Sequence, residues 1–360
     1  MGKMNLYISN FRFKKYSFVF LLFYILFSVN FFIFILKPEL FYWRAWEYYN
    51  EITHRIPGGR SWIGEEAGDM TRSFIFAGSK TRLTKVTADI EGFRSVPFVS
   101  ESYPVIFNGD SNTWGSCLSD EETIPWQVAS YLNTPVFNAT RTDKDFSYSI
   151  KNPRFKNSKI IVELFVQANV YAHVFDAPFI PKDFEKPIKS YSAFSDVHPK
   201  RYMVLLKWLN KLDFTHLFHE IRKLLFLDSR LMVKNRAYSY GLSEESLNQI
   251  AEGISRRAEV LERMGFKYVF SIVPARDLQL SPIIDPNEIE QEKLLSRKLC
   301  ERGIRYIDLC EVFRKDPDPK NLFFPNDTHV NPSGAKLIAH TVAAYLKENF
   351  PAEINCAAAK

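Results

Sequence analysis

A serine stands directly after an apolar run, where its hydroxyl could act as a nucleophile. The run is residues 105–108 (VIFN), and Gly109, Asp110 and Ser111 follow it. A serine hydroxyl is a poor nucleophile until a base removes its proton, and the base works best when a third group orients it. Most isolated Gly-Asp-Ser sequences are turns. A nucleophilic Ser111 therefore requires a histidine and an acid elsewhere in the chain.

A histidine beside an acid occurs in residues 324–336 (FPNDTHVNPSGAK). Asp327 precedes His329 by two residues, so its carboxylate can accept from Nδ1–H and leave Nε2 free to face Ser111. Metal binding by the same pair is the weaker alternative, because no further His or Cys cluster supplies ligands. The sequence thus predicts Ser111, His329 and Asp327 as the catalytic residues, with no metal and no cofactor.

Apolar runs alternate with helical patterns from residue 103 onward. The predicted strands are 104–109, 135–138, 159–166, 267–274 and 305–309. The predicted helices are 123–132, 244–265, 287–303 and 334–350, the last entered through Pro332 and Ser333. The strand runs are continuous rather than alternating, as in strands that are covered on both faces. The order predicts a doubly wound parallel sheet, whose functional residues gather at the carboxyl ends of its strands. Ser111 lies at such an end.

The order of these motifs resembles that of the SGNH, or GDSL-type, hydrolases, over about residues 100–350. The resemblance implies a three-layer α/β/α fold, ester hydrolysis or acyl transfer, and a Ser-His-Asp site. It makes Ser111 the nucleophile and gives its backbone N–H a place in the oxyanion hole. The family's third block has an Asn after a strand, and Asn169 stands there, so the resemblance implies an oxyanion donor in its side-chain amide. A strand-end turn is the alternative for Asn169.

Two positions differ from the family pattern. The second block has a glycine that donates its backbone N–H to the oxyanion, and Asp143 falls at that place. Any residue has an N–H, but a nearby carboxylate opposes a developing oxyanion. The acid spacing is Asp-x-His rather than Asp-x-x-His, which is similar to an extracytoplasmic branch related to alginate O-acetylation proteins. In that branch the Asp-x-His precedes the serine, whereas here it follows.

A charge-free apolar run near the N-terminus predicts a membrane anchor. Residues 17–36 contain about twenty residues, enough to span roughly 30 Å. Arg12, Lys14 and Lys15 precede the run, so residues 1–16 are predicted to be cytoplasmic and the rest extracytoplasmic, on the periplasmic side of the inner membrane. A cleaved signal peptide is the alternative, but no small-x-small site follows. Residues 37–100 read as a polar juxtamembrane lead-in.

Charge is concentrated in one part of the chain. Residues 197–236 contain nine Lys or Arg and three Asp or Glu, an excess equal to the chain's net charge of +6. This basic stretch lies in a predicted helical insertion at about 176–240, which is either an ordinary solvated helical face or a surface for anionic lipid or an acidic polymer. No nucleic-acid motif is present. The four cysteines show no metal spacing; free thiols are expected, with a Cys300–Cys310 bond as the alternative. Residues 351–360 read as a C-terminal tail.

These features together predict a single-pass membrane protein whose extracytoplasmic domain, residues 101–350, is a serine acyl-ester enzyme. The leading interpretation is O-acetyl transfer to, or removal from, a cell-envelope or secreted polysaccharide, with a membrane acyltransferase as a further partner. An esterase or lipase acting on lipid or small-molecule esters has the same triad chemistry. The third interpretation is a non-catalytic envelope assembly protein with an SGNH fold, which the Asp143 departure favours.

Overall fold

The computed structural model places the predicted core and parts of the segments before it. The described residues are 16–25, 28–29, 45, 58–66, 68, 81–100, 102–140, 155, 157–167, 169–170, 243–276, 286–325 and 327–358. The expected anchor, residues 17–36, is described only in part, and no helix within the described stretches is both long and apolar enough to cross a bilayer. Asp143 and the basic insertion at about 176–240 lie outside the described residues.

Five parallel strands form the central sheet, in the order β4-β3-β5-β6-β7. The strands are β3 (Val105–Gly109), β4 (Val136–Asn138), β5 (Ile160–Val166), β6 (Lys267–Val273) and β7 (Arg305–Ile307). The strand order reverses at β3, since β4 lies on one side of it and β5 on the other. In doubly wound sheets, ligands bind at the carboxyl ends of the strands beside such a reversal. The predicted α/β fold with a parallel sheet is confirmed.

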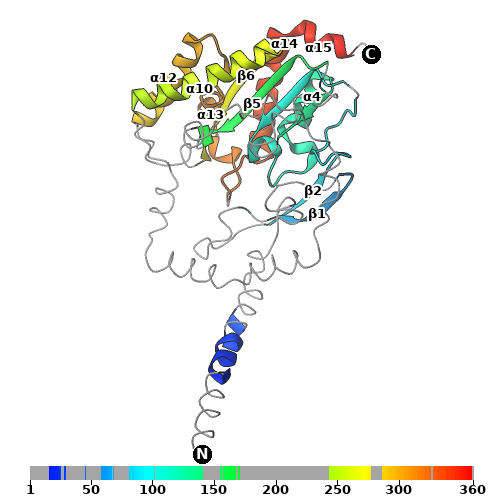
Figure 1. The fold of residues 1–360 in the computed structure, drawn as a ribbon, viewed down its shortest axis with the longest axis vertical. Coiled ribbons are helices and arrows are strands. Elements are labelled where there is room, and N and C mark those ends of the chain that lie inside the picture. Colours follow the sequence, from blue (N-terminus) through cyan, green and yellow to red (C-terminus); the bar gives the residue numbers. More distant parts are fainter. Residues whose placement is uncertain are drawn as a thin grey trace, which may run out of the picture.

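Helices cover both faces of this sheet (Figure 1). The covering helices are α4 (Ile124–Leu132), α10 (Glu244–Arg263), α12 (Pro286–Glu301) and α14 (Pro332–Asn349). Alternate residues of β3 face opposite layers. Val105 and Phe107 pack in the hydrophobic cluster of α4 and α14, whereas Ile106 packs in the cluster of α10 and α12. Because both faces are buried, the strand must be apolar throughout, which explains its continuous run.

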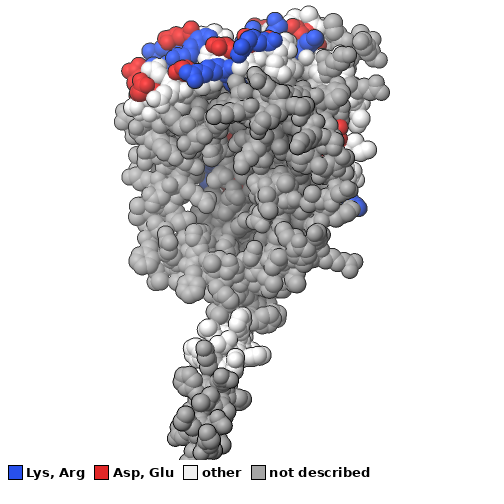
Figure 2. All heavy atoms as spheres, in the orientation of Figure 1, with Lys and Arg blue, Asp and Glu red and all other residues white. Residues whose placement is uncertain are grey.

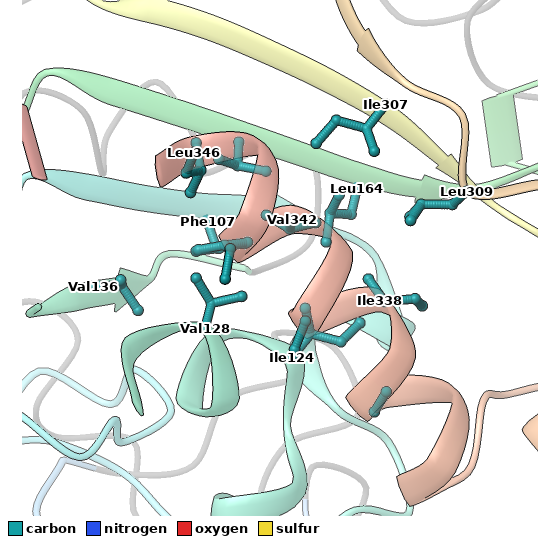
Figure 3. Close-up of a cluster of buried hydrophobic side chains, with 14 of the residues drawn as sticks. Phe107, Ile124, Val128, Val136, Leu164, Ile307, Leu309, Ile338, Val342 and Leu346 are labelled. Atoms are coloured by element: carbon teal, nitrogen blue, oxygen red, sulfur yellow. The ribbon is translucent and has the colours of Figure 1, made fainter. Parts of the chain in front are cut away.

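Figure 3 shows the first of these clusters, between the sheet and α14. Val342 and Leu346 of α14 and Val128 of α4 are fully buried beside Phe107. α14 begins at an Asn331 cap, whose side chain accepts from the backbone N–H groups of Ser333 and Gly334, at 2.9 and 3.1 Å. An Asn cap followed by proline is a strong helix start. This start fixes the C-terminal boundary of the loop that carries Asp327 and His329.

The outer face of α10 and α12 is charged in both signs. Figure 2 shows Lys and Arg intermingled with Asp and Glu over this layer. Several of these charges pair, including Arg256 with Glu252 within α10 and Lys293 with Glu290 within α12. Mixed charges of this kind are typical of a solvated helix face.

The lead-in, residues 37–100, for which no strand was predicted, contains two strands. β1 (Ser61–Glu66) pairs with β2 (Arg82–Thr87) as an antiparallel two-stranded sheet. Each strand alternates between more and less exposed residues. Ile63 and Leu83 stand at exposed positions of this alternation, so the sequence lacks the apolar–polar alternation that predicts a half-buried strand. Phe93, which follows, is buried in the cluster of α10 and α12. Part of the lead-in therefore packs on the α/β core.

The C-terminal end also differs from the expectation of a tail. Residues Pro351–Ala358 form helix α15, and Ile354 is buried in the cluster of α4 and α14. The alternative of a Cys300–Cys310 disulfide is wrong, because both are free thiols. Cys300 is exposed on α12, whereas Cys310 is fully buried on α13 (Leu309–Lys315).

Candidate active site

Ser111 is presented by a tight turn at the carboxyl end of β3. It is the first residue of a four-residue helix, α3 (Ser111–Trp114), whose N-cap is Asp110. A side chain on Gly109 would come within 2.0 Å of the Leu164 carbonyl oxygen and 2.3 Å of Thr113 Oγ1. Only glycine fits there. The sequence Gly-Asp-Ser is therefore a strand-to-helix turn in which the glycine allows close packing and the aspartate caps the helix.

Ser111, His329 and Asp327 form one chain of hydrogen bonds. Ser111 Oγ is 2.7 Å from His329 Nε2, and His329 Nδ1 is 2.6 Å from Asp327 Oδ1. His329 is 5% exposed and Asp327 is fully buried. With the carboxylate accepting from Nδ1–H, Nε2 carries the lone pair that faces the serine hydroxyl. The tertiary structure thus brings together three residues up to 218 positions apart in the order predicted from the sequence.

The loop carrying the acid and the histidine is held by its own backbone. Asp327 Oδ1 also accepts from the Thr328 N–H at 2.7 Å, and the Phe324 N–H donates to the His329 carbonyl at 3.2 Å. Phe323 and Val330 form an isolated β-bridge that closes the loop. The Asp-x-His spacing lets the Asp327 carboxylate reach His329 Nδ1, because the loop folds back on itself and is closed by the β-bridge.

Asn112 joins this loop to the nucleophile turn, a role that no sequence pattern predicted. Its Oδ1 accepts from the Val330 N–H at 3.1 Å, and the side chain is 4% exposed. Asn112, which directly follows Ser111, therefore holds the backbone of Val330, which directly follows His329. A buried hydrogen bond of this kind restrains the separation of Ser111 and His329.

Asn169 lies beside the same turn, as the sequence predicted. Its Nδ2 donates to Asp110 Oδ2 at 2.9 Å, and the Val166 N–H donates to the same oxygen at 2.5 Å. Asn169 is half-buried. An amide nitrogen has two N–H bonds, and Asp110 uses one of them. The other is available to a substrate atom next to Ser111.

Asp110 is the half-buried centre of this half of the site. Besides the two bonds to Oδ2, its Oδ1 accepts from the Asn112 N–H at 3.0 Å. Burial raises the pKa of the Asp110 carboxyl above its ordinary value, while its N–H donors and the nearby His329 oppose that rise. The base in contact with Ser111 Oγ is His329. The Asp110 carboxylate, through its three N–H donors, orients Asn169 and the serine turn.

Comparison with known proteins gives one family match. Residues 225–359 match the model of the SGNH hydrolase-like domain of the acetyltransferase AlgX. The matched stretch contains Asp327 and His329, and Ser111 and Asn169 lie before it. No curated protein sequence matches the chain.

Solved structures include distant matches described as GDSL proteins. A lipolytic protein of the G-D-S-L family from Desulfitobacterium hafniense DCB-2 is 14% identical, covers 69% of this chain and 100% of its own, and superposes with a TM-score of 0.37. A member of the lipolytic G-D-S-L family from Veillonella parvula DSM 2008 is 12% identical, covers 69% of this chain and 98% of its own, with a TM-score of 0.35. The resemblance to SGNH and GDSL-type proteins expected from the sequence is confirmed by the family model.

Proposed function

We propose that this chain, which resembles SGNH/GDSL-type proteins, is a serine acyl-ester enzyme that works by O-acetyl transfer or removal. The single observation that carries the proposal is the hydrogen-bonded chain from Ser111 Oγ through His329 to Asp327. Nucleophile, base and orienting acid are in hydrogen-bond contact, and the base and the acid are both buried.

In the proposed mechanism, His329 Nε2 removes the Ser111 proton as Oγ attacks the ester carbonyl carbon. The negative charge moves to the carbonyl oxygen, and the imidazolium is stabilised by the Asp327 carboxylate. The proton then passes from His329 to the leaving alcohol, which gives an acyl-Ser111 intermediate. Water, or a sugar hydroxyl, attacks that intermediate by the reverse sequence and releases Ser111.

The oxyanion is proposed to be held by the Ser111 backbone N–H and the Asn169 side chain. Ser111 is the first residue of α3, where the N–H has no partner within the helix. The second Asn169 N–H is free of the Asp110 contact. Each such donor contributes about 3 kcal/mol to the transition state in sites of this type. The proposal includes a third oxyanion donor, the backbone N–H at Asp143.

For the substrate, we propose a polysaccharide of the cell envelope or a secreted one. The support is the description of the matching family model, an AlgX acetyltransferase domain, together with the apolar run at residues 17–36. The run would hold the domain at the outer face of the inner membrane as a single-pass anchor. A membrane acyltransferase that supplies the acetyl group would then be the partner.

The test of catalysis compares the purified full-length chain with Ser111→Ala on p-nitrophenyl acetate. We expect Ser111→Ala to lose at least about a hundredfold in kcat/KM, with an unchanged melting temperature, because only the nucleophile is removed. Ser130→Ala is the matched control, since Ser130 is an exposed serine on α4. Equal rates for Ser111→Ala and the wild type would refute the catalytic proposal and favour the non-catalytic assembly protein.

Transfer and hydrolysis are separated by adding an acceptor. Mass spectrometry of a glycan incubated with enzyme and acetyl donor should show acetyl groups that Ser111→Ala does not add. Acetate release from an acetylated glycan, without acceptor labelling, would assign hydrolysis instead. Anchoring is tested by carbonate extraction of membranes: the full chain should stay in the pellet, and a chain without residues 1–36 should not.

A further inference from the structure

A cysteine thiol contacts the acid of the site on the side opposite the histidine. Cys117 Sγ is 3.1 Å from Asp327 Oδ2, although the two residues are 210 positions apart. Cys117 is 4% exposed and Asp327 is fully buried, so the contact is shielded from water. The other carboxylate oxygen, Oδ1, is the one that faces His329. The two oxygens of Asp327 therefore contact different partners, Cys117 at Oδ2 and His329 at Oδ1.

The backbone that carries this thiol adopts an uncommon conformation. Cys117 has φ +61°, in the left-handed region that few residues other than glycine adopt. Gly115, two residues earlier, also has a positive φ, of 91°. These two residues turn the chain directly after α3 so that the thiol faces the loop of Asp327. The contact is thus a consequence of the turn that follows the nucleophile helix.

A buried arginine holds this turn in place. Arg94 Nη1 donates to the carbonyl oxygens of Gly115 at 2.6 Å and of Trp114 at 3.1 Å, and Nη2 donates to that of Leu118. The guanidinium also pairs with Asp120 and lies 4.6 Å from the centre of the Trp114 ring. The rigid, fully buried Arg94 guanidinium therefore binds two carbonyl oxygens before Cys117 and one after it. The position of the thiol is therefore set by the backbone that Arg94 binds, and not only by its contact with Asp327.

We propose that Cys117 is a positioning residue for Asp327: its S–H donates to Oδ2 and thereby fixes the rotation of the carboxylate that keeps Oδ1 on His329. The inference rests on the proposed function of Asp327 as the orienting acid. A donor on a buried carboxylate oxygen also stabilises its charge. Without the Cys117 S–H, the Asp327 carboxylate can rotate. Its negative charge then also acts more strongly on the His329 imidazolium.

The experiment uses three variants of the full-length chain. Cys117→Ala removes the donor, Cys117→Gly removes it at a backbone conformation that glycine adopts without strain, and Cys117→Ser replaces the thiol with a hydroxyl donor. We expect the first two to lose about tenfold in kcat/KM on p-nitrophenyl acetate, as for one hydrogen bond to a charged group. The acid limb of the pH–rate profile should move to higher pH in both. Cys117→Ser should recover most of the rate and the wild-type limb.

A second readout does not depend on turnover. The proton between His329 Nδ1 and Asp327 gives a low-field resonance in the proton NMR spectrum, identified by its loss in His329→Gln. We expect this resonance to shift or broaden in Cys117→Ala and Cys117→Gly and to return in Cys117→Ser. If the wild type hydrolyses no ester but the resonance responds in this way, the positioning role stands and the proposed catalysis fails.

Two results would overturn the positioning role of Cys117. An unchanged resonance, together with an unchanged pH profile in Cys117→Gly, overturns the positioning role whatever the rate of the wild type. So does a rate loss that Cys117→Ser shares in full, because the loss would then reflect packing and not the donor. Should Cys117→Ala fail to fold, Cys117→Gly carries the comparison with Cys117→Ser, since its backbone requires no strained φ.

Discussion

Asp110, the middle residue of Gly-Asp-Ser, does more in this site than cap a short helix. Its two oxygens accept from three N–H groups, of Asn112, Asn169 and Val166. Val166 ends β5 and Asn112 follows the nucleophile, so one carboxylate joins two strands at the reversal of the sheet order. The side chain that places Asn169 beside Ser111 is therefore the neighbour of Ser111 in the sequence.

We predict that Asp110→Asn lowers activity and alters the pH dependence of stability. The amide would place an N–H against an N–H donor, so kcat should fall by about tenfold or more. Burial raises the pKa of Asp110 in the folded state, so the folded chain holds this proton more tightly than the unfolded chain. The wild type therefore gains stability relative to Asp110→Asn as pH falls through that raised pKa toward the ordinary one.

Urea unfolding of both proteins at neutral and mildly acidic pH measures this difference. Asp308→Asn is the matched control, because Asp308 also caps a helix, α13, and accepts from the Glu311 N–H at 2.8 Å. Asn caps helices about as well as Asp, so the control should change neither quantity. If the difference in unfolding free energy between the wild type and Asp110→Asn stayed constant with pH, the raised pKa of the Asp110 carboxyl would be contradicted.

At the scale of the elements, one ion pair links the sheet to its covering helix. Glu163 of β5 is fully buried, and both its oxygens accept from Arg257 of α10, with Nε to Oε2 at 2.6 Å. Asn108 of β3 and Tyr268 of β6 donate to the same carboxylate at 2.6 and 2.8 Å. Three adjacent strands and a helix thus share one carboxylate. Burial, with the nearby Glu163 charge, raises the pKa of the Tyr268 phenol well above its ordinary value.

We predict that Arg257→Met destabilises the fold by about 3–5 kcal/mol, because it leaves the Glu163 charge buried and unpaired by arginine. Arg256→Met, one position earlier on the same helix, is the matched control. Arg256 pairs with Glu252 at the surface, with both side chains more than half exposed. Such a pair contributes about 0.5 kcal/mol or less. Chemical denaturation that gave equal losses for the two variants would show that the buried pair has no special weight.

At the scale of the whole molecule, the sheet is stable because two separate layers bury its faces. Leu346 of α14 and Leu299 of α12 lie on opposite sides of it, and both are fully buried. Ser111 directly follows β3, at the carboxyl end of a strand that both layers cover. Neither layer alone would cover the apolar strands.

We predict that Leu346→Ala and Leu299→Ala each cost about 2–5 kcal/mol of unfolding free energy, as for other buried leucines. Leu83→Ala is the control, because Leu83 of β2 is 62% exposed, and it should stay within about 0.5 kcal/mol. Thermal or urea unfolding of the three variants measures these values. A Leu299→Ala loss no larger than that of Leu83→Ala would mean that the α12 layer is not packed as described.

The strands of the core were predictable because burial on both faces makes each of them apolar along its whole length. The run at residues 104–109 and strand β3 (Val105–Gly109) differ by one residue. β1 and β2 were missed for the converse reason: their residues alternate in burial, but the apolar Ile63 and Leu83 stand at exposed positions, so the sequence shows no apolar alternation. Helix α15 was missed because its sequence, PAEINCAA, is short and places the buried Ile354 among small and polar residues, without an apolar period.

The residue types of the candidate site, and the ends of the elements that carry them, follow from the sequence alone. Ser111 follows a strand and His329 precedes a helix, and both facts depend on local patterns of apolar, capping and turn residues. The fold is what brings Ser111 Oγ within 2.7 Å of His329 Nε2 and places Asn112, Asp110 and Cys117 in contact with their partners. Those contacts join residues dozens to hundreds of positions apart. Their formation follows from the order of strands in the sheet, which no local pattern encodes.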